Sequence, residues 1–204
     1  IKALFNSINQ LNKSGRKDIT MFILMYNTGA RLNEILSLKL KDVILNVKDP
    51  YISIIGKGNK LRCLYLLPKT VEHLEKYIQE NHINSKNDYY LFYSKIKGKE
   101  NKLSEQSVEK QLRKWAAIAN KLCKEIPLNL HPHQLRHSAA THWLDDGMNI
   151  VQISYLLGHE QLQTTMTYLE ITTAQKARAL EVIDDNKSEK VWKSEISSLT
   201  QLCK

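Results

Sequence analysis

The sequence is poor in cysteine, and no two of its cysteines are spaced to act together. Cys63, Cys123 and Cys203 lie far apart, and no CxxC pair occurs. A structural zinc site and a thiol–disulfide redox motif both need closely spaced cysteines, so neither is predicted. Isolated thiols in odd number are typical of a reducing compartment, and we interpret the chain as cytoplasmic with reduced cysteines.

Long apolar runs are also missing. No stretch approaches the ~20 consecutive apolar residues that a membrane-spanning helix needs, and no signal-peptide pattern occurs. We therefore expect no membrane partner. The chain begins at Ile1, without an initiator methionine and directly in a helical pattern, so we interpret it as a fragment with something missing in front.

Several well-known catalytic signatures are absent as well. There is no GxxxxGK[ST] loop, and Gln134 occupies the position at which an HExxH zinc motif requires glutamate. Asp145–Asp146 and Asp184–Asp185 are sequence neighbours whose side chains diverge on a helix, so they do not predict a magnesium site. We expect chemistry that uses no metal and no other cofactor.

Acidic residues are outnumbered by basic ones. The 204 residues include 30 lysines and arginines but only 21 aspartates and glutamates, which gives a formal net charge of +9. The length is sufficient for one domain with a real core or for two small ones. The charge favours an anionic partner, with nucleic acid ahead of a membrane surface, although a merely basic soluble protein has the same balance.

Hydrophobic spacing predicts mostly helices. Apolar residues recur at helical intervals over residues 2–11 and 17–28, with Ser14 and Gly15 as a break between them and Gly29 as a C-terminal stop. Helical spacing resumes over residues 31–39. Further helices are predicted over residues 68–80, 104–124, 132–146, 150–157 and 163–170.

Residues 42–66 have a different pattern, with three β-rich runs separated by turn residues. Gly58 and Asn59 predict a hairpin turn because both tolerate positive φ, so Lys57 would lie at the tip of a hairpin in a small antiparallel sheet. Residues 81–102 are interpreted as a loop, a short buried segment and a basic connector. The predicted fold class is mainly α with a small antiparallel β-sheet (α+β).

The segment 130–170 concentrates side chains that can act on a phosphodiester. His133 and Arg136 share one face of a predicted helix, His159 follows a glycine that ends the next helix, and Tyr168 lies shortly after it. Arginine can hold two phosphate oxygens, and imidazole can donate a hydrogen bond or move a proton. A tyrosine hydroxyl, with an ordinary pKa of ~10, can attack phosphorus in suitable surroundings.

Two basic residues far upstream suit the same chemistry. Arg31 begins a predicted helix with Glu34 one turn later, and Lys57 could protonate a departing oxygen. Each has a plainer interpretation, which is a surface ion pair worth about 0.2–0.5 kcal/mol for Arg31 and a solubilising turn residue for Lys57. The basic residues predicted to contact the DNA backbone are Lys60, Arg62, Arg113 and Lys114.

Four motifs, in this order, resemble those of the tyrosine recombinases. They are TGARLNEIL at 28–36, GKGNK at 56–60, the HxLRH box at 133–137 and the GH…TT…Y box at 158–168. The resemblance covers about residues 1–183, which it identifies as a catalytic domain with the tyrosine recombinase fold. It is closest to integrases of bacterial phages and mobile elements and to Xer-type resolvases. The family's catalytic set corresponds to Arg31, Lys57, His133, Arg136, His159 and Tyr168.

The resemblance implies site-specific strand exchange on double-stranded DNA, without metal or ATP. Tyr168 would attack a scissile phosphate and form a 3′-phosphotyrosyl link, and the freed 5′-hydroxyl would attack a partner strand. Four identical protomers would assemble in a synapse on DNA, whereas the isolated domain would be a monomer. Accessory DNA-bending or excision proteins are further partners. The N-terminal core-binding domain usual in the family is expected to be absent from this chain.

Residues 184–204 are interpreted as a C-terminal tail helix, with an amphipathic stripe formed by Trp192, Ile196, Leu199 and Cys203. We expect this tail to dock on a neighbouring protomer, and the alternative is a final helix that folds onto its own domain. Two other functions remain open beside recombination. One is a type IB topoisomerase-like enzyme, and the other is a non-catalytic DNA-binding module in which Tyr168 is a packing residue.

Overall fold

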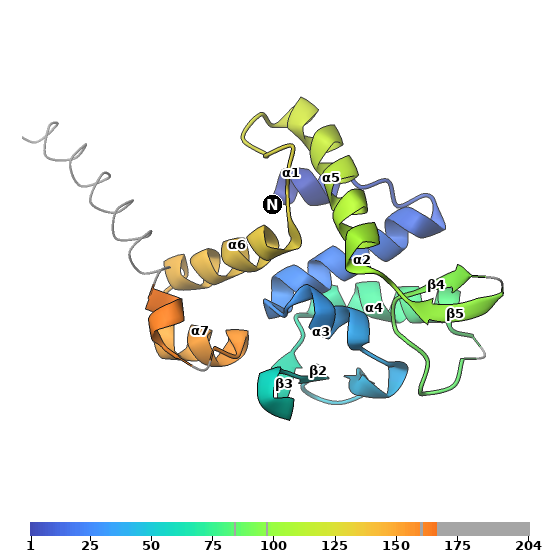
Figure 1. The fold of residues 1–204 in the computed structure, drawn as a ribbon, viewed down its shortest axis with the longest axis horizontal. Helices are drawn as coiled ribbons and strands as arrows, with labels where there is room; N and C mark the ends of the chain where they lie inside the picture. The colour runs from blue at the N-terminus through green and yellow to red at the C-terminus, as the bar shows by residue number, and fades with distance from the viewer. Residues whose placement is uncertain (84, 97, 160, 167–204) are drawn as a thin grey trace, which may run out of the picture.

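The structure is a computed structural model that describes residues 1–83, 85–96, 98–159 and 161–166. This part of the chain is mostly helical, with two small antiparallel sheets at the edges of the helical body, which confirms the predicted fold class (Figure 1). The helices are α1 Lys2–Asn6, α2 Lys13–Thr28, α3 Leu32–Ser37, α4 Pro68–Asn81, α5 Glu105–Leu122, α6 Pro132–Asp145 and α7 Ile150–Leu157. The strands are β1 Val43–Ile44, β2 Tyr51–Ile55, β3 Leu61–Tyr65, β4 Tyr93–Ile96 and β5 Lys99–Lys102.

Helix α2 forms the centre of the fold. It packs against α4 and α6, and its side chains Ile19, Phe22, Leu24 and Met25 are buried. Burying an apolar side chain of this size contributes roughly 1.5–3 kcal/mol to the free energy of unfolding. The nearly continuous apolar run of α2 therefore stabilises its packing against α4 and α6. The helix ends at Gly29, whose φ of 59° is left-handed, as the sequence predicted.

The N-terminal helices differ from the prediction. Helix α1 ends at Asn6 rather than at residue 11, and Ser14 and Gly15 lie inside the first turn of α2 instead of breaking a helix. The reason is the side chain of Asn12, which caps α2 by accepting a hydrogen bond from the backbone nitrogen of Gly15 at 2.6 Å. Asparagine is a strong helix N-cap residue, and this signal outweighs the glycine that follows it.

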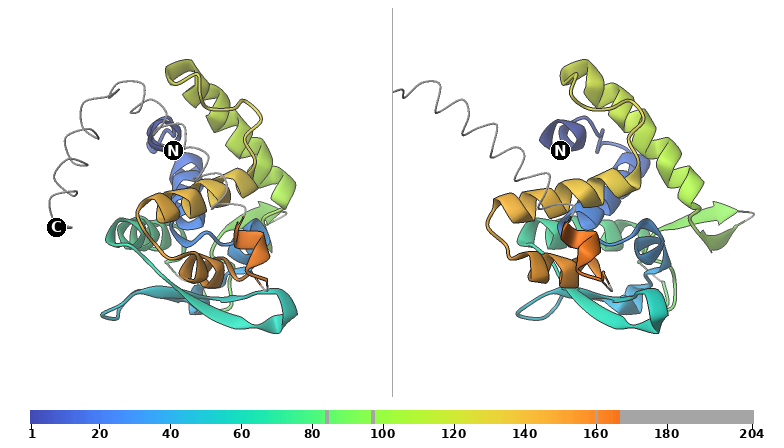
Figure 2. Two further views of the ribbon diagram at one scale, coloured as in Figure 1. Left: turned by 90° about the vertical axis from the view of Figure 1, so that its left-hand side faces the viewer. Right: turned by 60° about the vertical axis from the view of Figure 1, so that its left-hand side comes forward.

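Strands β1, β2 and β3 form an antiparallel sheet in that order. Ile52, Ile54 and Leu64 face the core, and the tip of the β2–β3 hairpin has positive φ at both Gly58 (71°) and Asn59 (58°), as predicted. The hairpin lies below α7 in both views of Figure 2. This position brings its tip toward the end of α7.

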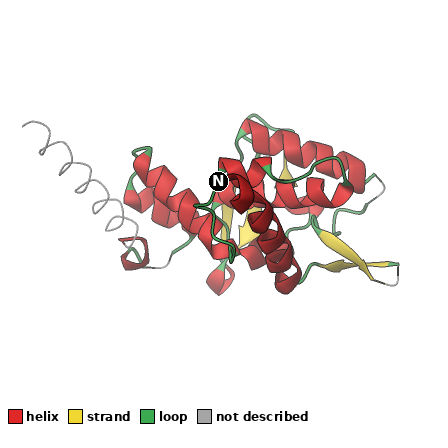
Figure 3. Cartoon of the chain, turned by 90° about the horizontal axis from the view of Figure 1, so that it is seen from above, coloured by secondary structure: helices red, strands yellow, loops and turns green. Residues whose placement is uncertain are grey.

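A second hairpin was missed by the sequence interpretation. Leu91 and Phe92 form the predicted buried segment, but residues 93–102 are not a connector, because β4 and β5 pair there as an antiparallel hairpin. This hairpin extends to one side of the helices (Figure 3). Its strands, YSKI and KENK, contain three lysines and little apolar sequence, and such a composition gives no hydrophobic alternation to detect.

Helices α6 and α7 complete the described part and agree with their predicted ranges. Helix α6 packs on α2, and α7 packs on α6 through Ala140, Ile153 and Leu157. Of the predicted helix over residues 163–170, residues 163–166 are helical, whereas Tyr168 and the tail 184–204 lie outside the described residues. None of the described helices is long and apolar enough to cross a membrane.

Candidate active site

Four of the six predicted catalytic residues line a single cleft. Arg31, His133, Arg136 and His159 surround a volume of about 370 Å³, together with Gly158, Gln161 and Thr164. They come from the beginning of α3 and, more than a hundred residues later, from the first turns of α6 and the corner after α7. The packing of α6 against α2, and of α7 against α6, creates this proximity.

Arg31 lies on the rim of the cleft. Its backbone nitrogen donates to the Glu34 carboxylate at 2.7 Å, which caps α3, and its guanidinium approaches the same carboxylate at 3.4 Å. The Arg31 side chain is nevertheless 42% exposed, so it can also meet an anion in the cleft. Arg31 therefore forms the i,i+3 ion pair of the plainer interpretation, and it also faces the cleft, as a phosphate-binding arginine would.

Arg31 also lines a second cleft of about 380 Å³, which is lined as well by Ile55 and Gly56 of the β2–β3 hairpin. Lys57 directly follows Gly56, so its backbone begins at the edge of this cleft. The side chain of Lys57 lies outside the described part of the structure. Its predicted role as a proton donor stays a prediction.

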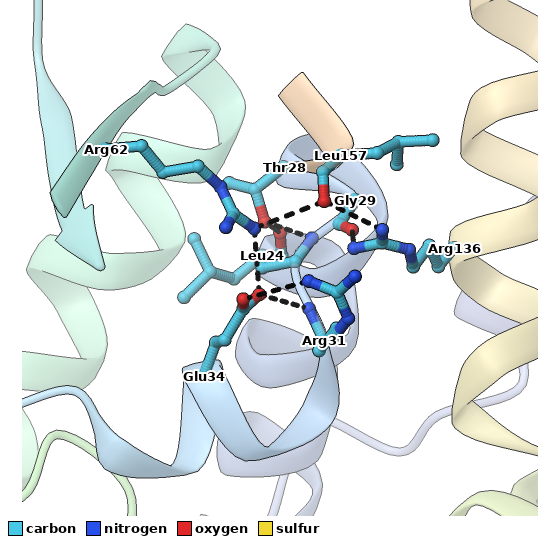
Figure 4. Close-up of polar contacts among 9 residues, drawn as sticks. Leu24, Thr28, Gly29, Arg31, Glu34, Arg62, Arg136 and Leu157 are labelled. Atoms are coloured by element: carbon cyan, nitrogen blue, oxygen red, sulfur yellow. Dashed lines mark hydrogen bonds and ion pairs between the residues drawn. The ribbon is translucent and has the colours of Figure 1, made fainter. Parts of the chain in front are cut away.

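Arg136 is the most enclosed of the four residues in this cleft, with an exposure of only 2%. Its Nη1 donates to the carbonyl oxygen of Gly29 at 2.6 Å, and its Nη2 donates to the carbonyl oxygen of Leu157 at 2.7 Å (Figure 4). A buried guanidinium needs such acceptors. These two bonds fix Arg136 between the end of α2 and the end of α7, with its edge on the cleft.

His159 is held by both its backbone and its ring. Gly158 has a left-handed φ of 64° and ends α7, and the His159 nitrogen donates to the Ser154 carbonyl at 3.0 Å. The ring Nδ1 lies 2.7 Å from Oγ1 of the buried Thr165. If the Thr165 hydroxyl donates to Nδ1, the neutral ring carries its proton on Nε2, ready to donate to a phosphate oxygen.

The electrostatics of the cleft keep its histidines neutral. Burial, followed by the positive charges of Arg136, Arg31 and Arg62, lowers the pKa of His159 to about 4. Burial, His137 and the same two cleft arginines also lower the pKa of His133. The His133 and His137 rings pack edge to face with centroids 4.4 Å apart. An arriving phosphate would therefore meet arginine charges and neutral imidazoles.

Three of the predicted DNA contacts are exposed. Lys60 lies just past the hairpin tip, Arg113 forms an i,i+4 ion pair with Glu109, and the Lys114 ammonium lies 5.2 Å from the centre of the Trp115 ring. Glu109 lines a further cleft of about 480 Å³ that includes Arg31 and His133, so Arg113 lies one helical turn beyond it. Their contact with DNA stays a prediction.

Arg62 does not have the position expected of a DNA-backbone contact. Its side chain is 10% exposed, and its Nη2 forms an ion pair with Glu34 at 2.9 Å. The pattern could have indicated this, because Arg62 lies two residues before the core-facing Leu64 on β3 and therefore points to the same face. The predicted contact of Arg62 with DNA rested on the charge of the residue alone, and it stays a prediction.

Some functional atoms had no signal in the sequence. The acceptors that fix Arg136 are the backbone carbonyl groups of Gly29 and Leu157, and any residue type supplies a carbonyl group. Among the described residues, no group of three histidine, cysteine or acidic side chains is arranged to hold a metal ion. The arrangement is suited to hold a phosphate with preset positive groups and hydrogen-bond donors, which stabilises charge that develops in a transition state.

Comparison with known proteins agrees with this geometry. The model of the Phage integrase family matches residues 1–175. Tyrosine recombinase XerA of Pyrococcus horikoshii is 35% identical over 166 residues, which are 81% of this chain and 54% of that protein. Tyrosine recombinase XerD of Staphylococcus saprophyticus is 33% identical over 177 residues, or 86% and 57% of the two chains. The chain thus spans about half the length of these relatives.

Solved structures give the same picture. The site-specific recombinase XerH, bound to a palindromic difH substrate in a post-cleavage complex, matches 94% of this chain and 51% of its own, with a TM-score of 0.71 and 26% identity. The XerA recombinase matches 86% of this chain with a TM-score of 0.68 and 25% identity. The Tn1549 transposon integrase, at 19% identity and a TM-score of 0.63, shares the fold.

Proposed function

Because this chain belongs to the phage integrase family, we propose that it is the catalytic domain of a site-specific tyrosine recombinase. It would break and rejoin double-stranded DNA through a covalent phosphotyrosyl link at Tyr168. The observation that carries the proposal is the convergence of Arg31, His133, Arg136 and His159 on one cleft. A non-catalytic DNA-binding module would need positive surface but no such convergence on the space of a single phosphate.

In the first step, the Tyr168 oxygen would form a bond to phosphorus while the bond from phosphorus to the 5′ oxygen breaks. The two arginines would hold the non-bridging oxygens, whose charge rises in the transition state. His159 would donate a hydrogen bond from Nε2, since its Nδ1 is engaged by Thr165. These groups are fixed before the phosphate arrives, so little reorganisation would oppose the reaction.

Proton transfer completes the balance of the step. The phenol of Tyr168 must lose one proton, and the departing 5′ oxygen must gain one. His133 would be a suitable acceptor, because its lowered pKa leaves the ring neutral at physiological pH. Lys57 on the hairpin would be the donor to the 5′ oxygen. Reversal of the step with a 5′-hydroxyl from another strand rejoins DNA, and the phosphotyrosyl bond retains the energy needed.

The test uses a pool of duplexes, each with a nick beside a randomised crossover region, so that a cleaved strand loses a short fragment and cannot be rejoined. The pool is incubated with the natural full-length protein that contains this chain. We expect a covalent protein–DNA adduct that survives denaturation and persists in EDTA. Sequencing the trapped DNA would identify the target.

Tyr168→Phe is the matched control, because it removes one oxygen and keeps the ring. It should bind DNA and form no adduct. An adduct formed equally by this variant would contradict the assignment of the nucleophile. Absence of any adduct with the wild-type protein on DNA that it binds specifically would favour the binding-module alternative.

Resolution of circular DNA is the second candidate outcome, because the relatives with 33–35% identity are Xer recombinases. Integration into a phage or mobile-element target is the first. Two copies of the trapped site are placed either on one plasmid or on two separate plasmids. Recombination within one plasmid indicates resolution, and recombination between two plasmids indicates integration. A tetrameric synapse would be measured in the same assay, as a complex of four protomers with two duplexes.

A further inference from the structure

Arg62 occupies an unusual place for a charged side chain. It pairs with Ile54 across the β2–β3 ladder and lies two residues before Leu64, so it projects from the face of the sheet that packs on the core. Only 10% of its side chain is exposed, and its Nε is buried with no hydrogen-bond partner among the described residues. A buried ion pair of this kind is weak evidence for a stabilising role, since desolvation offsets much of the attraction.

The guanidinium of Arg62 connects three separate segments (Figure 4). Its Nη2 lies 2.9 Å from Oε2 of Glu34 and 3.5 Å from the carbonyl oxygen of Leu157. The same Glu34 oxygen accepts a hydrogen bond from the backbone nitrogen of Arg31, and the same Leu157 oxygen accepts one from Nη2 of Arg136. Arg62 is therefore linked through one shared acceptor to each of the two cleft arginines.

Two glycines allow the guanidinium to approach this closely. A Cβ atom on Gly56 would lie 2.7 Å from Nη1 of Arg62, and one on Gly158 would lie 2.7 Å from Cζ. Each glycine immediately precedes a residue of the candidate site, Lys57 in the first case and His159 in the second. One side chain thus touches the backbone next to both residues and, through Glu34, the backbone of Arg31.

We propose that Arg62 is a positioning residue, which holds the Lys57 hairpin, the start of α3 and the His159 corner in register for strand cleavage. The inference rests on the proposed recombinase function. It replaces the sequence interpretation of Arg62 as a contact to the DNA backbone. A side chain enclosed by Glu34, Gly56 and Gly158 acts on the geometry of the site and not on DNA affinity.

The test measures cleavage and binding separately, on the DNA trapped by wild-type protein. For Arg62→Met, we expect the rate of adduct formation at saturating DNA to fall by ~10–100-fold, the size of effect that small misplacements cause. The dissociation constant and its dependence on salt should stay as in the wild type. Lys60→Met is the comparison for a true backbone contact, and it should reduce the slope of log K against log salt by about 1.

Arg62→Lys separates geometry from charge. Lysine keeps the positive charge but cannot bridge Glu34 and Leu157, so we expect a cleavage defect close to that of Arg62→Met. A DNA contact would instead tolerate lysine. If the methionine variant does not fold, the lysine variant decides alone. Cleavage by Arg62→Lys at the wild-type rate would overturn the proposal.

Trp115→Phe is the control for a merely structural role. It removes a buried hydrogen bond at the α2–α5 contact, away from the cleft. Studied at a temperature at which both proteins are folded, it should cleave at the wild-type rate while Arg62→Lys does not. Equal defects in both would overturn the proposal. A wild-type protein that forms no adduct would instead refute the recombinase function, so the two failures differ.

Discussion

Nη1 of Arg136 donates a hydrogen bond to the carbonyl oxygen of Gly29 at 2.6 Å, across 107 residues of sequence. The bond joins α6 to the end of the central helix and fixes an arginine of the candidate site. Arg136 is thus part of the folded framework as well as of the cleft. Its removal should affect stability and activity together, whereas removal of Arg31 should affect mainly activity.

The first prediction compares these two arginines. Arg136→Ala should lose about 2–4 kcal/mol of unfolding free energy, because the Gly29 and Leu157 carbonyl groups lose a charged, buried donor. Arg31→Ala should lose about 0–1 kcal/mol, because its side chain is 42% exposed. Both should abolish adduct formation. Urea denaturation measures the difference, and equal stabilities for the two variants would contradict the framework role of Arg136.

The second prediction concerns pH. The pKa of His159 is about 4 in the folded protein, against an ordinary value of 6.5. Between these values the unfolded chain binds a proton that the folded protein does not, so stability falls as pH falls through this window. We expect His159 to account for a loss on the order of 1 kcal/mol between pH 7 and pH 5, allowing for partial exposure of the ring.

His159→Gln is the matched variant for this experiment, because glutamine is polar and does not titrate. Its stability should depend less steeply on pH than that of the wild type. His133 and His137 also have lowered pKa values and contribute a background of the same sign to both proteins. Parallel curves for the two proteins between pH 7 and pH 5 would refute the contribution of His159.

The third prediction concerns Gly158. Replacement by alanine should cost about 1 kcal/mol for the left-handed φ of 64°, plus the cost of displacing the Arg62 guanidinium. Gly147 is a suitable control, because its φ is 90° and a Cβ there would meet nothing within 4 Å. Gly147→Ala should therefore have only the backbone cost and retain cleavage.

A double variant isolates the contact. Combining Gly158→Ala with Arg62→Met should cost less than the sum of the two single changes, since the methionine side chain removes the crowded group. Strict additivity in a denaturation cycle would show that the two residues do not interact.

The fourth prediction concerns the buried carboxylate of Asp18, which accepts a hydrogen bond from Nε1 of Trp115 at 2.9 Å. Burial raises the pKa of Asp18, and the Trp115 bond opposes this rise. An acid with a raised pKa binds more protons in the folded state, so its contribution to stability is lost as pH rises through the folded pKa.

Trp115→Phe removes the opposing hydrogen bond, so it should raise the pKa of Asp18 further. We expect a loss of about 1–3 kcal/mol at pH 7, and a smaller loss at pH 5. Asp18→Asn should be close to neutral, because the amide oxygen can still accept from the indole and no charge is buried. A Trp115→Phe loss that is larger at pH 5 would contradict the assignment.

Most of the helices follow from local spacing. Helices α2 and α7 end at the C-caps Gly29 and Gly158, helix α5 begins after the N-cap Ser104, and helix α6 begins at Pro132. The backbone or capping preferences of these residues act within a few residues of the chain. The β2–β3 hairpin follows from Gly58 and Asn59 in the same way. The break expected at Gly15 was wrong, because a cap three residues earlier outweighs it, and the β4–β5 hairpin has no apolar alternation to reveal it.

The sequence by itself determined the fold class, the main helices and the residues that can carry phosphate chemistry, since these depend on residue type and short spacing. Only the tertiary structure decided which of them meet. It brought Arg31, His133, Arg136 and His159 to one cleft, and it enclosed Arg62 behind Glu34. The physical reason is that these neighbours are joined through long-range packing and through backbone carbonyl groups, and neither depends on a local pattern of side chains.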